Sequence, residues 1–203
     1  MKKRVATKSR KTTETNITVK LTVDGEGKSK IDTPIGLLNH MLELFAFHGL
    51  FDLELKAKGD TAKVDMHHTN EDIGLVLGEA FKDALTDKLG IKRSGSASFP
   101  MEDVVANVVL DLSGRAFFKE IERPVGSVID RDEFGYNLEY ANHFFESFAN
   151  KLGMNLNIKI SGANTDLHTN LEPVFKAFGK ALDQATQIDA RRKGIPSTKG
   201  LID

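Results

Sequence analysis

The feature that most constrains this chain is an internal duplication, in which the second half repeats residue types of the first about 100 residues later. The matched pairs are His40 with His143, Glu43 with Glu146, Phe45 with Phe148, Gly59 with Gly162, His67 with His168, Glu71 with Glu172 and Gly78 with Gly179. Chance supplies a few apolar matches, but it explains matched His, Glu and Gly together poorly. We therefore predict two fused copies of one compact unit rather than a solenoid.

Hydrophobic periodicity predicts the elements of each copy. Residues 16–23 alternate apolar and polar side chains, which indicates a half-buried strand, and Asp24-Gly25 after it indicates a hairpin turn. Helical spacing covers residues 35–48, with a stop at Gly49, and residues 70–89, with a stop at Gly90. The remaining predicted elements are strands at 50–58, 104–112, 116–122 and 154–161 and helices at 133–151 and 170–188, the last with Pro173 in its first turn.

These elements predict an α+β fold of two fused pseudo-repeats of β-β-α-β-α, with helices packed on one face of each sheet. The first half covers residues 1–93 and the second half residues 94–190. Residues 191–203 form a C-terminal tail that is predicted to be a loop and to bind substrate. With 203 residues the chain can bury a sizeable core, so we expect one integrated catalytic domain.

Composition narrows the classes of function. The formal net charge of -1 predicts no general attraction to nucleic acid or to an anionic membrane. The absence of cysteine excludes disulfides, thiolate zinc sites and a cysteine nucleophile, so any metal must be held by His and carboxylate side chains. No apolar run reaches the length of a bilayer, and Met1-Lys2-Lys3-Arg4 is not followed by the apolar segment of a secretory signal. We expect a cytoplasmic protein.

The sharpest chemical motif is the run from His67-His68 to Glu71. On a helix, His67 and Glu71 lie on one face and can share a metal ion, whereas His68 points about 100° away and can serve a different one. Two imidazoles and a carboxylate suit Mn, Fe, Zn or Ni. The alternative for a single motif of this kind is a solvated helix N-terminus. Its partial repetition at His168 and Glu172 favours a metal site.

Two further histidines, His40 and His143, occupy equivalent positions in the predicted helices. Their equivalence favours metal ligation over the alternative, which is capping or packing at the start of an apolar helix. His48 lies two helical turns beyond His40 and has no counterpart, because Lys151 stands at the matching position. We predict that His48 contacts substrate rather than metal.

Basic residues in constrained places indicate an anion-binding site. They are Arg93, Arg115, Lys176 and Lys199, and the Ser and Thr residues of the tail add hydroxyl donors. The alternative is that these side chains are simply solvated. Solvation is also the favoured interpretation of the charged leader at residues 10–15, which precedes the first predicted strand.

Taken together, these motifs resemble the imidazoleglycerol-phosphate dehydratases over nearly the whole chain and in the same order. The segments that carry the resemblance are Arg10-Lys11-Thr12-Thr13-Glu14-Thr15, Asn39-His40-Met41-Leu42, His48-Gly49, His67-His68-Thr69-Asn70-Glu71-Asp72, Gly90-Ile91-Lys92-Arg93, Leu110-Asp111-Leu112-Ser113-Gly114-Arg115, His143-Phe144-Phe145, Glu172-Pro173-Val174-Phe175-Lys176-Ala177 and Ile195-Pro196-Ser197-Thr198-Lys199-Gly200. The resemblance implies a lyase of histidine biosynthesis that dehydrates imidazole glycerol phosphate to imidazole acetol phosphate.

The resemblance also implies a set of site residues and partners. Two Mn²⁺ ions per subunit are expected, with the ligands His40, His67, His68, Glu71, His143, His168 and Glu172. Phosphate contacts are expected from Arg93, Arg115, Lys176, Ser197 and Lys199. The residues expected to take part in catalysis are Glu14, His48 and Glu71, with Glu14 in an acid/base role. Self-association into a large symmetric homo-oligomer, a 24-mer in this family, is implied as well.

Several departures from the family pattern fall near the expected metal ligands. Asn39 stands in place of an Asp beside His40, and loss of an orienting carboxylate is expected to weaken metal affinity by about 10–100-fold. Met66 stands where an Asp usually precedes the His pair, and Leu44 stands where a Gln is expected near substrate.

The most serious departure is Thr169, which stands where the repeated motif should supply a second histidine. Asp166, Thr169 itself or a water molecule is left as the substitute ligand. This loss motivates a second hypothesis, that the chain is a catalytically weakened or inactive metal-binding oligomeric relative. A purely structural oligomer leaves the histidine motif unexplained. Two tightly bound ions per subunit are expected for the enzyme, and one or none for the weakened relative.

Overall fold

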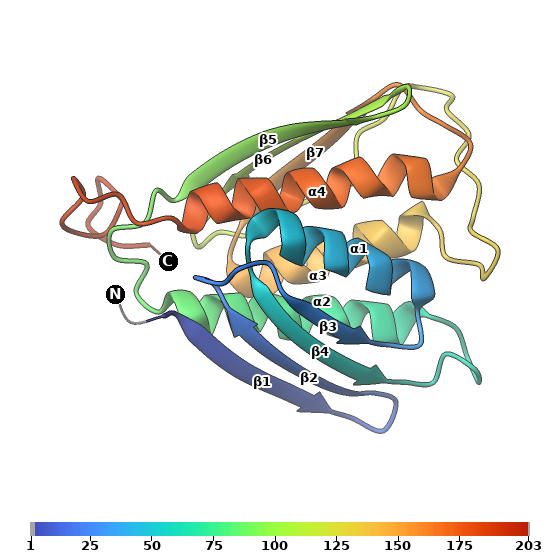
Figure 1. The fold of residues 1–203 in the computed structure, drawn as a ribbon, viewed down its shortest axis with the longest axis horizontal. Coiled ribbons are helices and arrows are strands. Elements are labelled where there is room, and N and C mark those ends of the chain that lie inside the picture. Colours follow the sequence, from blue (N-terminus) through green and yellow to red (C-terminus); the bar gives the residue numbers. More distant parts are fainter. Residues whose placement is uncertain (1–2, 203) are drawn as a thin grey trace.

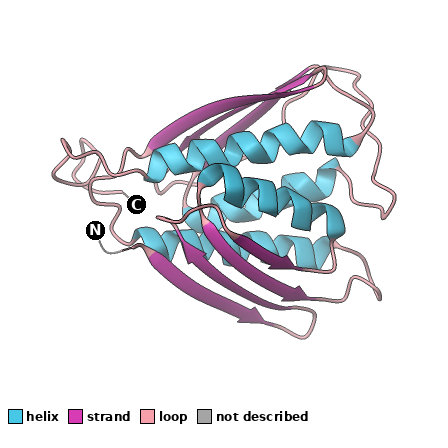
Figure 2. Cartoon of the chain, viewed as in Figure 1, coloured by secondary structure: helices cyan, strands magenta, loops and turns pink. Residues whose placement is uncertain are grey.

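The computed structural model, which describes residues 3–202, places four helices between two β-sheets (Figure 1). Figure 2 shows the two sheets on the outside and the helices in the middle. The α+β class and the fusion of two related halves are therefore confirmed, with helices on one face of each sheet. Within residues 3–202, no helix is both long enough and apolar enough to cross a membrane.

The first half of the chain forms a four-stranded sheet and two helices. Its strands are β1 (Val5–Lys11), β2 (Asn16–Thr22), β3 (Ser29–Asp32) and β4 (Asp52–Lys58), in the order β1-β2-β4-β3. Its helices are α1 (Gly36–Gly49) and α2 (His67–Leu85). The predicted alternation in β2 is confirmed, because Ile17, Val19 and Leu21 are buried on the face that meets the helices.

The second half forms a three-stranded sheet and two helices. Its strands are β5 (Ser94–Met101), β6 (Val104–Asp111) and β7 (Asn155–Ser161), in that order, and its helices are α3 (Leu138–Leu152) and α4 (Leu167–Thr186). The strand predicted at residues 116–122 is wrong, because this segment makes only isolated parallel bridges to β7, through Phe117 and Glu122. It runs beside β7 as β3 runs beside β4, but without continuous pairing.

The chain turns around β2 differently from the prediction. The hairpin partner of β2 is β1, which precedes it, and not a strand after Asp24-Gly25. That predicted hairpin is wrong, because the chain passes on to β3, which bonds in parallel to β4. The interpretation of residues 10–15 as an exposed leader is confirmed for the exposure of Arg10, Lys11, Thr13 and Glu14, but it is wrong in placing the whole segment before the sheet. Residues 10 and 11 end β1, and Thr15 is buried in the turn that joins β1 to β2.

Of the two predicted glycine stops, Gly49 ends its helix and Gly90 does not. Gly49 is the last helical residue of α1, and Leu50 takes the left-handed conformation beyond it, with φ 56°. Gly49 is needed for packing, because an added Cβ would lie 2.9 Å from the carbonyl oxygen of Gly179. Helix α2 ends at Leu85, before Gly90, and Thr86 breaks the helical conformation there with φ 50°.

Side-chain caps set the starts of α3 and α4. The Asn137 side chain accepts a hydrogen bond from the backbone N–H of Tyr140, so α3 begins later than predicted. The Asp166 side chain caps α4 in the same way, through the N–H of Thr169, so α4 begins earlier. Pro173 consequently lies inside the helix rather than in its first turn, where it removes one backbone hydrogen bond.

The two halves pack helix against helix. Helix α1 lies against α4, and α2 lies against α3, so each contact joins one helix from each half. Each helix contributes a phenylalanine to the centre, namely Phe45, Phe81, Phe148 and Phe178. Burial of these large rings supplies much of the apolar area that holds the halves together.

Glycines allow the paired helices to approach closely. A Cβ added at Gly78 of α2 would lie 2.6 Å from the carbonyl oxygen of Phe148 on α3. The equivalent Gly179 of α4 faces the carbonyl oxygen of Phe45 on α1 at still closer range. Because Phe45 and Phe148 are a repeat pair, the same helix crossing occurs twice. Each crossing fixes how the two paired helices are aligned along their axes, and so which of their side chains meet.

Replacing Gly179 by alanine is expected to lower the free energy of unfolding by about 1–3 kcal/mol, because the new methyl group meets a backbone oxygen that cannot rotate away. The better helix propensity of alanine, up to about 1 kcal/mol, offsets only part of this. Urea unfolding measures the difference. Gly36→Ala is the control, since nothing lies within 4 Å of its added Cβ. Equal stability of the Gly179→Ala variant and the parent would contradict the close crossing.

Candidate functional site

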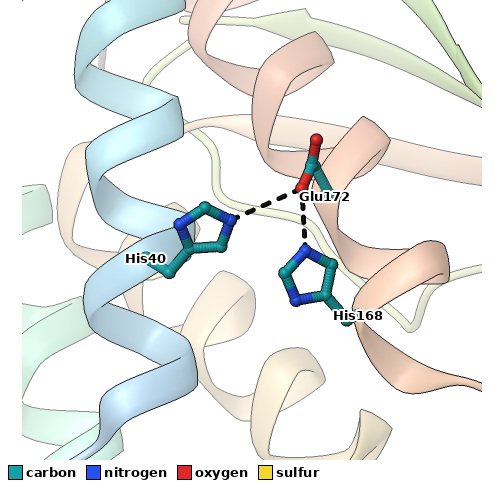
Figure 3. A group of neighbouring side chains, drawn as sticks. All are labelled: His40, His168 and Glu172. Carbon is teal, nitrogen blue, oxygen red and sulfur yellow. Dashed lines mark hydrogen bonds and ion pairs between the residues drawn. The ribbon is translucent and has the colours of Figure 1, made fainter.

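One group of side chains that could hold a metal ion lies between α1 and α4 and consists of His40, His168 and Glu172. Figure 3 shows both imidazole rings directed at the same carboxylate oxygen. Glu172 Oε2 is 2.8 Å from His168 Nε2 and 3.4 Å from His40 Nε2. The two rings stack with centroids 5.0 Å apart. Two imidazoles and a carboxylate are a donor set that suits a divalent transition metal.

The other oxygen of the Glu172 carboxylate is held by a lysine. Lys176 lies one turn further along α4, and its Nζ donates to Glu172 Oε1 at 2.5 Å. Burial by itself raises the pKa of Glu172, but hydrogen bonds from Lys176, His168 and His40 outweigh it and lower the pKa to about 2. The carboxylate is therefore ionised at neutral pH and oriented with one oxygen toward the histidines.

A second group lies between α2 and α3 and consists of His67, Glu71 and His143. His67 Nε2 is 3.6 Å from Glu71 Oε2, and the rings of His67 and His143 have centroids 4.8 Å apart. All three side chains line one open pocket of about 300 Å³. His143 Nδ1 is buried and has no hydrogen-bond partner among the described residues. A buried nitrogen without a partner is costly, and a bound metal ion or substrate would supply that partner, so this donor set also fits a metal.

A third group forms where the β1–β2 turn meets the start of α2. His68 Nδ1 lies 3.0 Å from Asp60 Oδ2 and 3.9 Å from Glu14 Oε2. The hydrogen bond with Asp60 is the main reason that the pKa of His68 is raised, and the charge of Glu14 adds to it. His68 thus serves a different group from His67, as the helical spacing predicts.

The histidine groups combine residues from opposite halves of the chain. His40 of the first half meets His168 and Glu172 of the second, while His143 of the second half meets His67 and Glu71 of the first. This exchange follows from the packing of α1 on α4 and α2 on α3.

His48 lies in the last turn of α1, on the side of α4 and β5. Its ring contacts Phe99 of β5 edge to face, with centroids 5.1 Å apart. Burial and the nearby charge of Lys176 lower the pKa of His48, and Glu172 opposes them. His48 is therefore close to the first histidine group without being part of it, and its contact with substrate stays a prediction.

The residues around the missing histidine are used to cap a helix. Asp166 Oδ2 accepts hydrogen bonds from the backbone N–H and the hydroxyl of Thr169, at 2.8 and 2.9 Å. These hydrogen bonds hold both side chains at the start of α4. Neither bond is made to His168 or Glu172. Sequence reasoning named both as substitute ligands and missed their capping role.

The contacts of the other departures involve residues other than the expected ligands. Asn39 exchanges two hydrogen bonds with Thr33 rather than with its neighbour His40. Leu44 and Met66 pack against the hydrophobic core. The contacts of these three residues therefore stabilise the local structure around them.

The five residues predicted to bind phosphate are not joined into one group by the hydrogen bonds and ion pairs of residues 3–202. The Arg93 guanidinium donates to both oxygens of Asp111, at 2.6 and 2.8 Å, and to the carbonyl of Pro196 at 2.9 Å. Arg93 thus holds the tail that carries Ser197 and Lys199, whereas Lys176 is bound to Glu172. The Arg115 and Lys199 side chains make no hydrogen bond or ion pair within residues 3–202.

Two carboxylates in the neighbourhood were missed as site residues. Asp60 joins the group of His68, and one of its oxygens is buried without a hydrogen-bond partner among the described residues. Asp72 is the last residue of the motif that begins at His67. It accepts hydrogen bonds from Thr15 and Arg10 of the first hairpin. Asp60 and Asp72 have no counterparts in the repeat, so they carried no sequence signal beyond lying seven residues before His67 and four residues after His68.

Comparisons with known proteins point to one family. A family model described as imidazoleglycerol-phosphate dehydratase matches residues 33–182. A protein of that name from Pelobacter propionicus is 47% identical over 200 residues, covering 98% of this chain and 99% of the relative. One from Geobacillus kaustophilus is 49% identical over 196 residues, covering 96% of each.

Solved structures agree with the sequence comparison. The crystal structure of imidazoleglycerol-phosphate dehydratase from Staphylococcus aureus is similar with a TM-score of 0.75 and 33% identity, over 91% of this chain and 99% of that one. The enzyme from Pyrococcus furiosus, in complex with (S)-C348, has a TM-score of 0.78 and 33% identity, over 96% of this chain and 99% of that one.

Proposed function

The chain belongs to the imidazoleglycerol-phosphate dehydratase family, and from this premise we propose how its residues carry out the reaction. It is a hydro-lyase of histidine biosynthesis, which removes water from imidazole glycerol phosphate to give imidazole acetol phosphate. The observation that carries the proposed mechanism is the assembly of imidazole and carboxylate side chains from both halves of the chain.

Two manganese ions per subunit are assigned to these side chains. One ion would be held by the group of His40, His168 and Glu172, and the other by the group of His67, Glu71 and His143. His68, which is directed away from His67, is proposed as a ligand of a metal ion other than the one at His67. The donor sets support this assignment, because imidazole and carboxylate suit Mn²⁺ in the absence of thiolates. Bound there, Mn²⁺ supplies Lewis acidity to the imidazole ring of the substrate.

The remaining roles belong to side chains that hold the substrate or move a proton. The carbon that loses its proton has no adjacent carbonyl, so a positioned base is needed. Glu14 takes this role, since its carboxylate is half-exposed and lies beside His68. Lys176 keeps Glu172 oriented, and His48 contacts the substrate. The basic residues bind the phosphate and fix the reacting atoms in place.

The phosphate site is proposed to be completed between subunits of a homo-oligomer, expected to be a 24-mer. Within one chain Arg93 is bound to the tail that carries Ser197 and Lys199, whereas Lys176 is bound to Glu172, so another copy is proposed to complete the group of five anion-binding residues. A phosphorylated substrate is retained inside cells by its charge, which supports a cytoplasmic location.

A second candidate is a catalytically weakened relative that keeps the fold and binds less metal. Thr169 favours it, because the residue at the histidine position is buried and its hydroxyl donates to Asp166, the residue that caps α4. This candidate predicts one tightly bound ion per subunit, or none, and slow turnover.

A metal titration separates the two candidates. Chelator-treated protein is expected to be inactive, and added Mn²⁺ is expected to restore formation of imidazole acetol phosphate with two ions bound per subunit. Thr169→His is expected to tighten the weaker ion by about 10-fold or more, since the capping bond from the backbone N–H survives the change. Thr169→Asn is the control without an imidazole. Activity that is equal with and without metal would reject the proposed mechanism, and one ion with slow turnover would favour the weakened relative.

A further inference from the structure

A buried carboxylate of α2, that of Asp72, accepts hydrogen bonds from the first hairpin of the chain. Asp72 is only 7% exposed. Its Oδ2 accepts a hydrogen bond from the hydroxyl of Thr15 at 2.5 Å, and its Oδ1 accepts one from Arg10 Nε at 2.7 Å. One donor, Arg10, lies at the end of β1 and the other, Thr15, lies in the turn that joins β1 to β2, and Glu14 lies between them in the chain. The carboxylate therefore ties the hairpin to the helix from both sides of Glu14.

The turn that carries Glu14 is itself braced. The backbone N–H of Thr12 donates to the carbonyl of Thr15 at 2.9 Å. The hydroxyl oxygen of Thr12 accepts from the backbone N–H groups of Glu14 and Thr15, at 3.1 and 2.9 Å. The turn thus moves as one piece, and its position relative to α2 is set by what anchors Thr15.

The helix that supplies the anchor also carries the histidines. His68 and Asp72 are one turn apart on α2, so they share a face of the helix. Asp72 holds the turn, and the turn presents Glu14 with Oε2 3.9 Å from His68 Nδ1. We propose that Asp72 is a positioning residue, which holds Glu14 at a fixed place relative to His68 through Thr15. This inference rests on the acid/base role proposed for Glu14.

Stability alone accounts poorly for this arrangement. Burial of the Asp72 carboxylate costs desolvation that its attraction to the half-exposed Arg10 barely returns, so an apolar contact would hold the hairpin about as well. A carboxylate that accepts hydrogen bonds from two donors, by contrast, fixes the position of the hairpin relative to α2. The same hairpin contains another hydrogen bond made by a threonine hydroxyl, between Ser9 and Thr18 at 3.1 Å. This bond is exposed and does not involve α2, so it provides a comparison for the bond of Thr15.

The test compares kcat, KM and bound manganese in variants of the full-length protein. Thr15→Val keeps the shape of the side chain and removes the hydroxyl, and Asp72→Asn removes the charge. Both are expected to lower kcat about 10–100-fold with little change in KM or metal content, because a displacement of about 1 Å at the reacting group costs this much. Thr15→Ser is expected to restore kcat. Thr18→Val is the matched control in the same hairpin, and its kcat is expected to be unchanged.

A double variant shows whether Thr15 acts through Glu14. If it does, Thr15→Val lowers kcat no further once Glu14→Gln is present. Multiplying losses in the double variant, or an unchanged kcat in Thr15→Val, would overturn the positioning role. Full turnover in Glu14→Gln alone would instead reject the acid/base role on which the inference rests, so the two failures are distinguishable.

Discussion

Replacement of Glu172 by glutamine is expected to lower turnover by at least about 100-fold and to release one manganese ion per subunit. The side chain supplies the only carboxylate of the group with His40 and His168, and glutamine keeps its size but removes its charge. Replacing a residue that only orients a metal ligand typically lowers metal affinity or activity by about 10–100-fold. Replacing a ligand itself is expected to lower them by at least as much.

Two features of the site make this effect large. The pKa of Glu172, lowered to about 2 by Lys176 and the two histidines against the effect of burial, leaves the carboxylate ionised at any pH at which the enzyme is assayed. Its loss also leaves the half-buried Lys176 ammonium, 22% exposed, without its partner. A positive charge would then face the two imidazoles where a metal ion should bind, and repulsion would weaken binding further.

Bound metal and product formation are measured on the same preparation. Glu79→Gln is the matched control, because Glu79 is also a helical glutamate near a lysine, with Oε1 3.6 Å from Lys8 Nζ, but lies outside the histidine groups. Such an exposed pair contributes little, so the control should keep its metal and its turnover. A Glu172→Gln protein with full metal content and normal turnover would remove the first metal site from the mechanism.

Replacement of Glu14 by glutamine is expected to lower turnover by about 10²–10⁴-fold, the usual contribution of a general acid or base. Metal content and KM should stay near those of the parent, since the amide keeps the shape and Glu14 belongs to neither of the two proposed manganese sites. The 52% exposure of its side chain leaves the carboxylate accessible to substrate, while the turn around it is fixed by the Thr12 and Thr15 hydrogen bonds.

Product formation under saturating substrate, together with metal analysis, checks this prediction. Glu26→Gln is the control, because Glu26 is an exposed glutamate in another connection of the same sheet and, within residues 3–202, forms an ion pair with Lys28 alone. Its turnover should match the parent. A Glu14→Gln variant with unchanged turnover would show that another group moves the proton.

Much of the fold was predictable because its signals are local. The alternation of Ile17, Val19 and Leu21 has the period of a strand, and helical spacing marked all four helices. The boundaries were less predictable. Gly49 has the residue type of a helix stop, but its missing side chain is used where α1 meets Gly179 of α4. A contact between residues so far apart in the chain leaves no local pattern.

The sequence by itself determined the duplicated α+β architecture, the family and the chemical types of the candidate ligands, because residue identity and spacing carry that information. Only the tertiary structure decided which ligands meet. The repeat is equally compatible with groups formed within each half, and the packing of α1 on α4 and α2 on α3 directs His40 to Glu172 and His143 to His67 instead. Likewise, Asp166 caps α4 and Asp72 grips the first hairpin, because a carboxylate binds the donors that folding brings to it.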